Sequence, residues 1–286
     1  MPINLIAAAV SPTNVSPSDV QQIELDSNIL GGPILVIFVA MFVPILAYFI
    51  LEREIKMGVF PFFSGGVAYV ILYAASMLIS SLISMLIPGD TAGQVISIIV
   101  SLILEAAIML GVFGYMHIFR NKLPQTAHGV GAMLGYSFGE LTFLVATPAI
   151  VTLMTTYSMI NLAQSGTNLT QTELIALAGA GSIGLSDYIA SSLNCIVWIV
   201  ARTGVGVMLW LAATRQDSSK ALIASLVSGA LISLPSILNQ TVGIGVWPSV
   251  AILSVVAAAI WFAAIKFHGM FIDNPIIKKY SKKRAR

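Results

Sequence analysis

The chain has 286 residues, of which 57% are hydrophobic and only 9% are charged, and its formal net charge is +2. Soluble domains usually carry about 25% charged residues, so this composition excludes an ordinary soluble globular protein. Most of the surface must therefore face lipid or other membrane-embedded helices. The single cysteine, Cys195, excludes an intrachain disulfide framework and a zinc site built from cysteines.

The chain begins with a polar segment. Residues 1–28 are rich in Ser, Pro, Asn and Asp, lack a basic start and contain only a short apolar run, so they do not resemble a signal peptide. We expect three regions: an extracytoplasmic tail over 1–28, a transmembrane domain over 29–266 and a basic cytoplasmic tail over 267–286.

The middle region contains seven apolar runs, each long enough to cross about 30 Å of hydrocarbon as a helix. This pattern predicts an all-α polytopic membrane protein with seven transmembrane helices. The predicted spans are 30–51, 59–87, 94–119, 130–160, 188–213, 221–239 and 247–266. Pro148 allows a kink in the long fourth span. The mildly apolar segment 162–187 predicts a short interfacial helix that begins near Thr172.

The distribution of lysine and arginine predicts the orientation of these spans. With seven spans, every Lys and Arg except Arg202 falls on the side that holds the C-terminal tail. Because basic residues accumulate in cytoplasmic loops, we expect the N-terminus outside and the C-terminus in the cytoplasm. The expected location is the plasma (cytoplasmic) membrane, and the first expected partner is the lipid bilayer.

Three ionisable side chains lie well inside predicted spans, away from the span ends: Glu105, Glu140 and Arg202. Helical rise places them about 22, 15 and 19 Å from the cytoplasmic boundary, so the three side chains can meet in the middle of the membrane. One interpretation is a structural ion pair between Arg202 and one glutamate, which leaves the other glutamate unexplained. The other is a functional site, because charged groups inside membranes are costly and often mark one.

Glycines at four-residue spacing precede Glu140. Gly131, Gly135 and Gly139 share one face of the fourth span, where small residues allow a neighbouring backbone to approach closely. Similar small-residue faces occur in two other spans: Ser225, Gly229 and Ser233, and Ser76, Ser80 and Ser84.

The sequence gives no sign of a cofactor. Its histidines fall near predicted cytoplasmic ends, away from the depth of the glutamates, so no metal site is expected within the bilayer. Neither a Ser–His pair at matching depth nor a phosphate-binding glycine loop is present, and no cofactor, metal or nucleic acid is expected.

The order of these features resembles one family, the YhfC-type branch of the CAAX-protease-like superfamily of glutamic intramembrane proteases, which also contains the Aph subunit of gamma-secretase. The resemblance lies in "LILEAAIMLGVF", the basic turn "RNK", the glycine repeat "GAMLGYSFGE", the segment "EREIKMGVFPFFSGGVAYVI" and "VARTGVGVMLWLAATR". The chain departs from active members at several positions. Ala106 follows Glu105 where a second glutamate is expected, Met109 stands near the place of an arginine, and Phe138 is closest to a family histidine.

The resemblance implies a divergent glutamic peptidase or a catalytically degenerate scaffold or substrate-binding subunit. In a peptidase, Glu105 would activate water, Arg202 would orient a carboxylate and Glu140 would be the second acid. Its partner would be a transmembrane protein, as substrate or as neighbouring subunit. A small transporter or channel that uses the buried charges as an ion or proton relay is the alternative.

Overall fold

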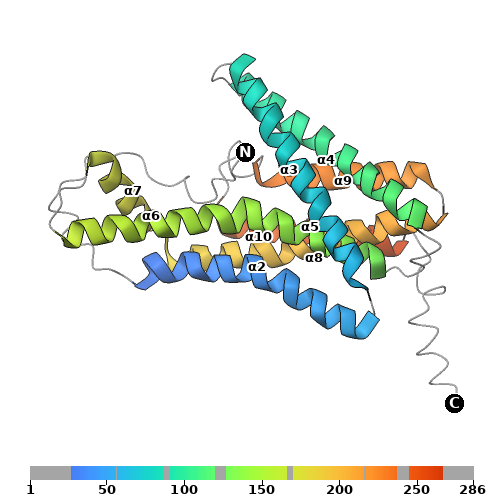
Figure 1. Ribbon diagram of the computed structural model, residues 1–286, viewed down its shortest axis with the longest axis horizontal. Helices are drawn as coiled ribbons and strands as arrows, with labels where there is room; N and C mark the ends of the chain where they lie inside the picture. The colour runs from blue at the N-terminus through green and yellow to red at the C-terminus, as the bar shows by residue number, and fades with distance from the viewer. Residues whose placement is uncertain are drawn as a thin grey trace.

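The computed structural model describes residues 27–55, 57–86, 91–119, 127–165, 170–215, 217–236 and 245–266. Every regular element in these ranges is a helix (Figure 1). The helices are α2 (Ser27–Ile55), α3 (Val59–Leu86), α4 (Thr91–Phe119), α5 (Ala127–Leu141), the π-helix η1 (Thr142–Ala146), α6 (Thr147–Gln164), α7 (Gln171–Ser182), α8 (Leu185–Arg215), α9 (Ser218–Ser236) and α10 (Val246–Lys266). Residues 1–26 and 267–286, which make up almost all of the two predicted tails, lie outside the described residues.

Six helical stretches are long and apolar enough to cross a membrane. They are Ile29–Glu54, Val59–Ile79, Ile98–Ile118, Ala127–Leu162, Leu185–Thr214 and Val246–Lys266. The protein is therefore an all-α polytopic membrane protein, as predicted. The remaining predicted span, the sixth (221–239), corresponds to α9, whose apolar stretch Ser218–Leu231 is shorter than the other six. The count of seven, the orientation and the identity of the membrane stay predictions.

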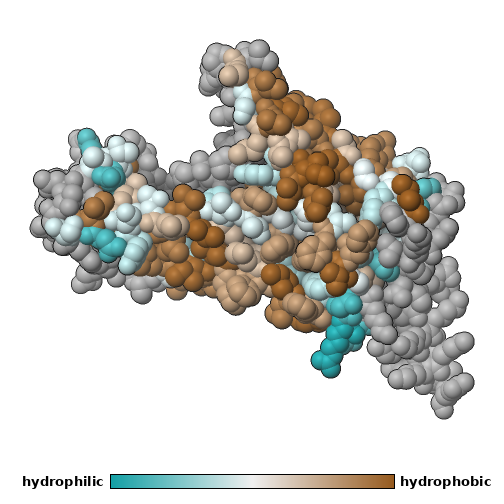
Figure 2. All heavy atoms as spheres, in the orientation of Figure 1, coloured by the Kyte–Doolittle hydropathy of each residue, from teal (hydrophilic) through white to brown (hydrophobic). Residues whose placement is uncertain are grey.

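The outer surface of these helices is suited to lipid. Large apolar side chains such as Phe63 and Phe262 are more than half exposed. Figure 2 shows hydrophobic residues over much of the described surface that faces the viewer. The exception among the long helices is α8, most of whose length is buried inside the bundle. It is therefore the central helix, and α2, α4, α5, α9 and α10 all pack against it.

The helices approach one another most closely where glycines face a neighbouring backbone. A Cβ on Gly135 would lie 1.7 Å from the carbonyl oxygen of Phe62 in α3, and one on Gly65 would lie 1.7 Å from that of Ala132 in α5. Gly129 and Gly206 face each other in the same way between α5 and α8. Only residues without a side chain permit this separation, so the glycines fix α5 between α3 and α8.

Of the other predicted small-residue positions, Gly229 on α9 is tightly constrained, because a Cβ there would lie 2.7 Å from the carbonyl oxygen of Leu102 in α4. The remaining glycines are less so. A Cβ on Gly131 would lie 3.3 Å from Pro61, and one on Gly139 would lie 3.0 Å from the ring of Tyr69. In the two serine-containing faces, Ser225 is fully buried, while Ser76 donates to the carbonyl of Tyr73. The side chains of Ser80, Ser84 and Ser233 lie outside the described set.

The long fourth span is interrupted where Pro148 predicts a kink. Helices α5 and α6 are joined by η1, and the backbone N–H of Thr147 donates to the carbonyl of Thr142, five residues earlier. Pro148 has no N–H to donate to Leu144 and its ring crowds that carbonyl, so an undisturbed α-helix cannot pass through this point.

The predicted helix within 162–187 is α7. Its N-cap is Thr170, which forms a reciprocal capping box with Glu173. The side-chain and backbone hydrogen bonds from Thr170 hold the pKa of the Glu173 carboxyl below its ordinary value. Whether α7 lies at a membrane interface stays a prediction.

Candidate functional site

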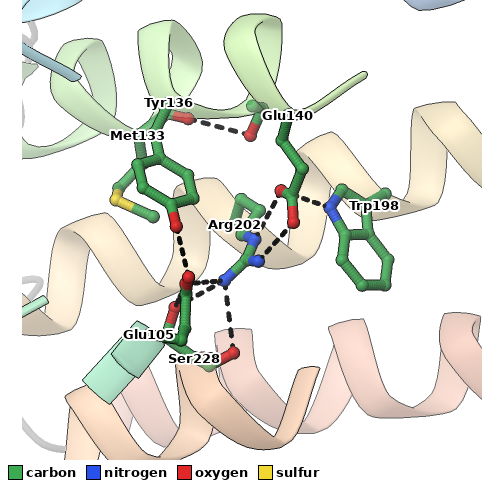
Figure 3. Close-up of polar contacts among 8 residues, drawn as sticks. Glu105, Met133, Tyr136, Glu140, Trp198, Arg202 and Ser228 are labelled. Carbon is green, nitrogen blue, oxygen red and sulfur yellow. Dashed lines mark hydrogen bonds and ion pairs between the residues drawn. The ribbon is translucent and has the colours of Figure 1, made fainter. Parts of the chain in front are cut away.

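The structure brings Glu105, Glu140 and Arg202 together (Figure 3). Glu105 lies on α4, Glu140 on the last turn of α5, and Arg202 near the middle of α8. Their exposed fractions are 0%, 1% and 0%, so the cluster is shielded from solvent and from lipid alike. The glycine contacts of α5 with α3 and α8 place Glu140 close enough to α8 to reach Arg202.

Arg202 and Glu140 form a bidentate ion pair. The guanidinium donates from Nε to Glu140 Oε2 at 2.9 Å and from Nη2 to Oε1 at 2.5 Å. The indole Nε1 of Trp198 donates to the same Oε2 at 2.6 Å. Two parallel N–H···O bonds fix the plane of the carboxylate as well as its position. Glu140 is therefore held by three donors, all of them on α8.

Glu105 is held by donors on three other helices. Arg202 Nη1 donates to Glu105 Oε1 at 2.7 Å and to Ser228 Oγ on α9 at 2.5 Å. The Ser228 hydroxyl then donates to Glu105 Oε1 at 2.7 Å, and the hydroxyl of Tyr136 on α5 donates to Oε2. The cluster thus connects α4, α5, α8 and α9 at one level.

Aromatic rings line the guanidinium. Its central carbon lies 5.2 Å from the ring centroid of Tyr136 and 5.2 Å from that of Trp198. Cation–π contacts of this kind are strongest where water is excluded. The ring of Tyr69 on α3 packs edge-on against Tyr136 at a centroid distance of 5.2 Å. The helix α3 therefore supports the cluster without contributing a charge.

The sequence analysis missed Tyr136, Trp198 and Ser228. A signal for two of them was present, because Tyr136 precedes Glu140 by four residues and Trp198 precedes Arg202 by four, so each shares a helical face with its charged neighbour. Ser228 gives no comparable signal. It follows Ser225 by three residues and lies beside Gly229, but its distance from Arg202 depends on how α9 packs.

The hydrogen bonds of the two carboxylates limit the chemistry that the cluster can perform. All four carboxylate oxygens accept hydrogen bonds from protein donors. Within the described residues, no group of three or more His, Cys, Asp and Glu side chains could hold a metal ion. Two of the three histidines lie within the described residues: His117 contacts the carbonyl of Ala213, and His128 packs against Trp210.

Comparison with protein-family models, with curated proteins and with solved structures finds no match to this chain. Membership of the YhfC-type branch therefore stays a prediction that rests on the short motifs. The site has to be interpreted from its own geometry.

Proposed function

We propose that this chain is a non-catalytic integral membrane protein that acts as a scaffold or substrate-binding subunit for another transmembrane protein. In this proposal the cluster of Glu105, Glu140 and Arg202 holds the helices in register. The observation that carries it is the saturation of both carboxylates: each oxygen already accepts from a side chain of the protein, and neither residue is more than 1% exposed.

A glutamate that activates water needs a free lone pair within hydrogen-bond distance of that water. It also needs donors that are directed at the position of the developing oxyanion. In the cluster, the donors of Arg202, Tyr136 and Trp198 are directed at the carboxylates themselves. Their geometry supports fixing Glu105 and Glu140 in place, and it supports peptide hydrolysis much less.

One observation favours a second candidate, a proton relay. The cluster contains two carboxyl groups and a single guanidinium, so it has one carboxyl more than it has cations. A buried group of that composition can take up and release one proton. We keep a small proton-coupled transporter as the alternative function.

The deciding experiment uses purified protein in lipid nanodiscs, incubated with a library of transmembrane peptides and read by mass spectrometry. Wild type is compared with Glu105→Gln, Glu140→Gln and, as a matched control, Glu54→Gln, whose side chain is exposed at the end of α2. We expect no cleavage by any variant. Cleavage by wild type that Glu105→Gln abolishes and Glu54→Gln preserves would refute the non-catalytic proposal.

The relay is tested separately in liposomes that carry a pH gradient and an internal pH-sensitive dye. A scaffold leaves the decay of the gradient at the rate of empty liposomes. Faster decay with wild type and Glu54→Gln, lost in Glu140→Gln, would move the assignment to a proton-coupled transporter.

A further inference from the structure

In two neighbouring helices, α2 and α6, a proline interrupts the backbone hydrogen bonds at about the same distance from the ends that lie near α7. Two prolines lie inside α2, Pro33 and Pro44, and the second is 17 residues after Ser27; Pro148 in α6 lies 16 residues before Gln164. At 1.5 Å per residue, each of Pro44 and Pro148 is about 24–26 Å from the end of its helix near α7. The π-helix η1, just before Pro148, packs against α2. The two interruptions therefore lie side by side.

Each proline removes a backbone hydrogen bond from its helix. Pro44 cannot donate to the carbonyl of Ala40, and Pro148 cannot donate to that of Leu144. In η1, the backbone N–H and the hydroxyl of Thr147 both donate to the carbonyl of Thr142, the hydroxyl at 2.8 Å. Such π-segments are often found at functional sites, and proline is a common cause of sharp helix bends.

The helices before and after η1 are packed to different degrees. On one side, α5 is buried along most of its length and clamped by glycine contacts to α3 and α8. On the other side, α6 packs mainly on α2 and exposes a row of large side chains, among them Val151, Met154 and Tyr157. The far ends of α2, α6 and α7 share a small apolar cluster of their own, formed by Ile29, Ile160 and Leu177, apart from the main core.

The ring of Tyr188 packs this end of α2 against α8, along which α2 makes further contacts. A Cβ on Gly32 would lie 2.1 Å from Cδ2 of Tyr188, whose side chain is buried at the beginning of α8. The ring thus packs directly on the backbone of α2. In Figure 1 the far ends of α2 and α6 lie together with α7 at the left of the view, while α3 and α4 rise away from them.

We propose that residues 27–43 of α2, residues 148–164 of α6 and α7 form one arm that swings away from α8 about Pro44 and η1. The contact of Tyr188 with Gly32 helps to hold the arm closed, together with the packing of Ile37 and Ala40 on the main core. The charged cluster around Arg202 does not move with the arm. Glu140 precedes η1 in the chain, and α5 is held by the glycine contacts to α3 and α8. Trp198 lies one turn nearer the arm than Arg202, so opening uncovers the Trp198–Glu140 side of the cluster. The motion is independent of whether the cluster is catalytic.

The size of the motion follows from the length of the arm. A bend of about 20°, the threshold of a sharp kink, moves the tip of a 24 Å arm by about 8 Å. Spin labels at Thr172→Cys on α7 and Ala251→Cys on α10 report this displacement, since both positions are exposed. The background is Cys195→Ser, which removes the single native thiol. Labels at Val59→Cys and Thr214→Cys form the control pair at the clamped end.

Pulsed electron paramagnetic resonance distances in nanodiscs then test the proposal. We expect Tyr188→Ala to change the mean Thr172–Ala251 distance by about 8 Å, or to broaden the distribution of that distance by a similar amount. The Val59–Thr214 distance should stay unchanged. When Pro44→Ala and Pro148→Ala are added to Tyr188→Ala, the distribution of Thr172–Ala251 distances should narrow again, because the two hinge prolines are gone. Where Tyr188→Ala does not fold, Tyr188→Leu gives the same comparison. An unchanged distance after loss of the ring, or equal changes in both pairs, overturns the proposal.

Discussion

Replacing each of two adjacent glycines in α3 by alanine should change the free energy of unfolding in opposite directions. Gly65 and Gly66 are neighbours in the sequence, but only Gly65 lies too close to the backbone of α5 to carry a side chain. A Cβ on Gly65 would lie 1.7 Å from the carbonyl oxygen of Ala132 and 2.9 Å from the amide nitrogen of Tyr136. A Cβ on Gly66 would lie 3.5 Å from the carbonyl oxygen of Gly135, an ordinary contact.

The expected magnitudes follow from these distances. Replacing a helical glycine by alanine gains about 1 kcal/mol of helix propensity, and Gly66→Ala should realise most of that gain. For Gly65→Ala, an ordinary contact requires α3 and α5 to separate by roughly 1.7 Å or more, and overpacking of this kind costs about 1–3 kcal/mol or more. Since the separation also loosens the facing contact of Gly135 with Phe62, we expect a net loss of about 2 kcal/mol.

The difference between the two variants is therefore about 3 kcal/mol, or roughly 150-fold in the unfolding equilibrium. Reversible unfolding in mixed micelles of increasing denaturing detergent, followed by circular dichroism, measures it. Gly111→Ala on α4 is a further control, because no atom of a neighbouring helix lies within 4 Å of its Cβ position. Equal stabilities for Gly65→Ala and Gly66→Ala would refute the close approach of α3 to α5.

Three further predictions concern the cluster and α7. Arg202→Gln leaves two buried carboxylates without their cation and should destabilise the fold by about 3–5 kcal/mol in the same unfolding assay. Tyr136→Phe removes the hydroxyl that donates to Glu105 and should cost about 1.5–3 kcal/mol, whereas the exposed Tyr157→Phe should change stability by less than about 0.5 kcal/mol. The pKa of Glu173 is lowered in the folded protein, so its capping contribution is present above the unfolded value of about 4.3 and is lost as the pH falls through the folded value. Cα chemical shifts of α7 should therefore lose helical character on acidification, and Glu173→Gln should abolish that dependence.

Two of these predictions have clear contrary outcomes. If Arg202→Gln is as stable as wild type, the guanidinium does not neutralise the buried carboxylates. If Tyr136→Phe and Tyr157→Phe behave alike, the hydroxyl of Tyr136 contributes nothing to the cluster.

Much of the helical architecture could be predicted from the sequence, because lipid requires a local pattern. A helix in hydrocarbon satisfies its own backbone groups and presents apolar side chains, so long apolar runs predict its position within a few residues. The predicted span 59–87 corresponds to α3, and 247–266 to α10. The sixth predicted span, 221–239, corresponds to α9, whose apolar stretch is shorter than the others.

The presence of buried charges was also predictable, whereas their arrangement was not. Helical rise places Glu105, Glu140 and Arg202 at similar depth, but depth alone allows Arg202 to pair with one glutamate and leave the other free. In the structure it binds both, through different nitrogens.

The sequence by itself therefore determined the class of the protein, the approximate limits of its long helices and the depth of its ionisable residues. All of these depend on composition and on rise along a single helix. Tertiary structure alone decided that one arginine serves two glutamates, that Ser228 completes the cluster and that Gly65, unlike Gly66, must lack a side chain. The physical reason is that neighbouring residues of a helix differ by about 100° in direction, so each contact depends on how that helix is rotated against its neighbours.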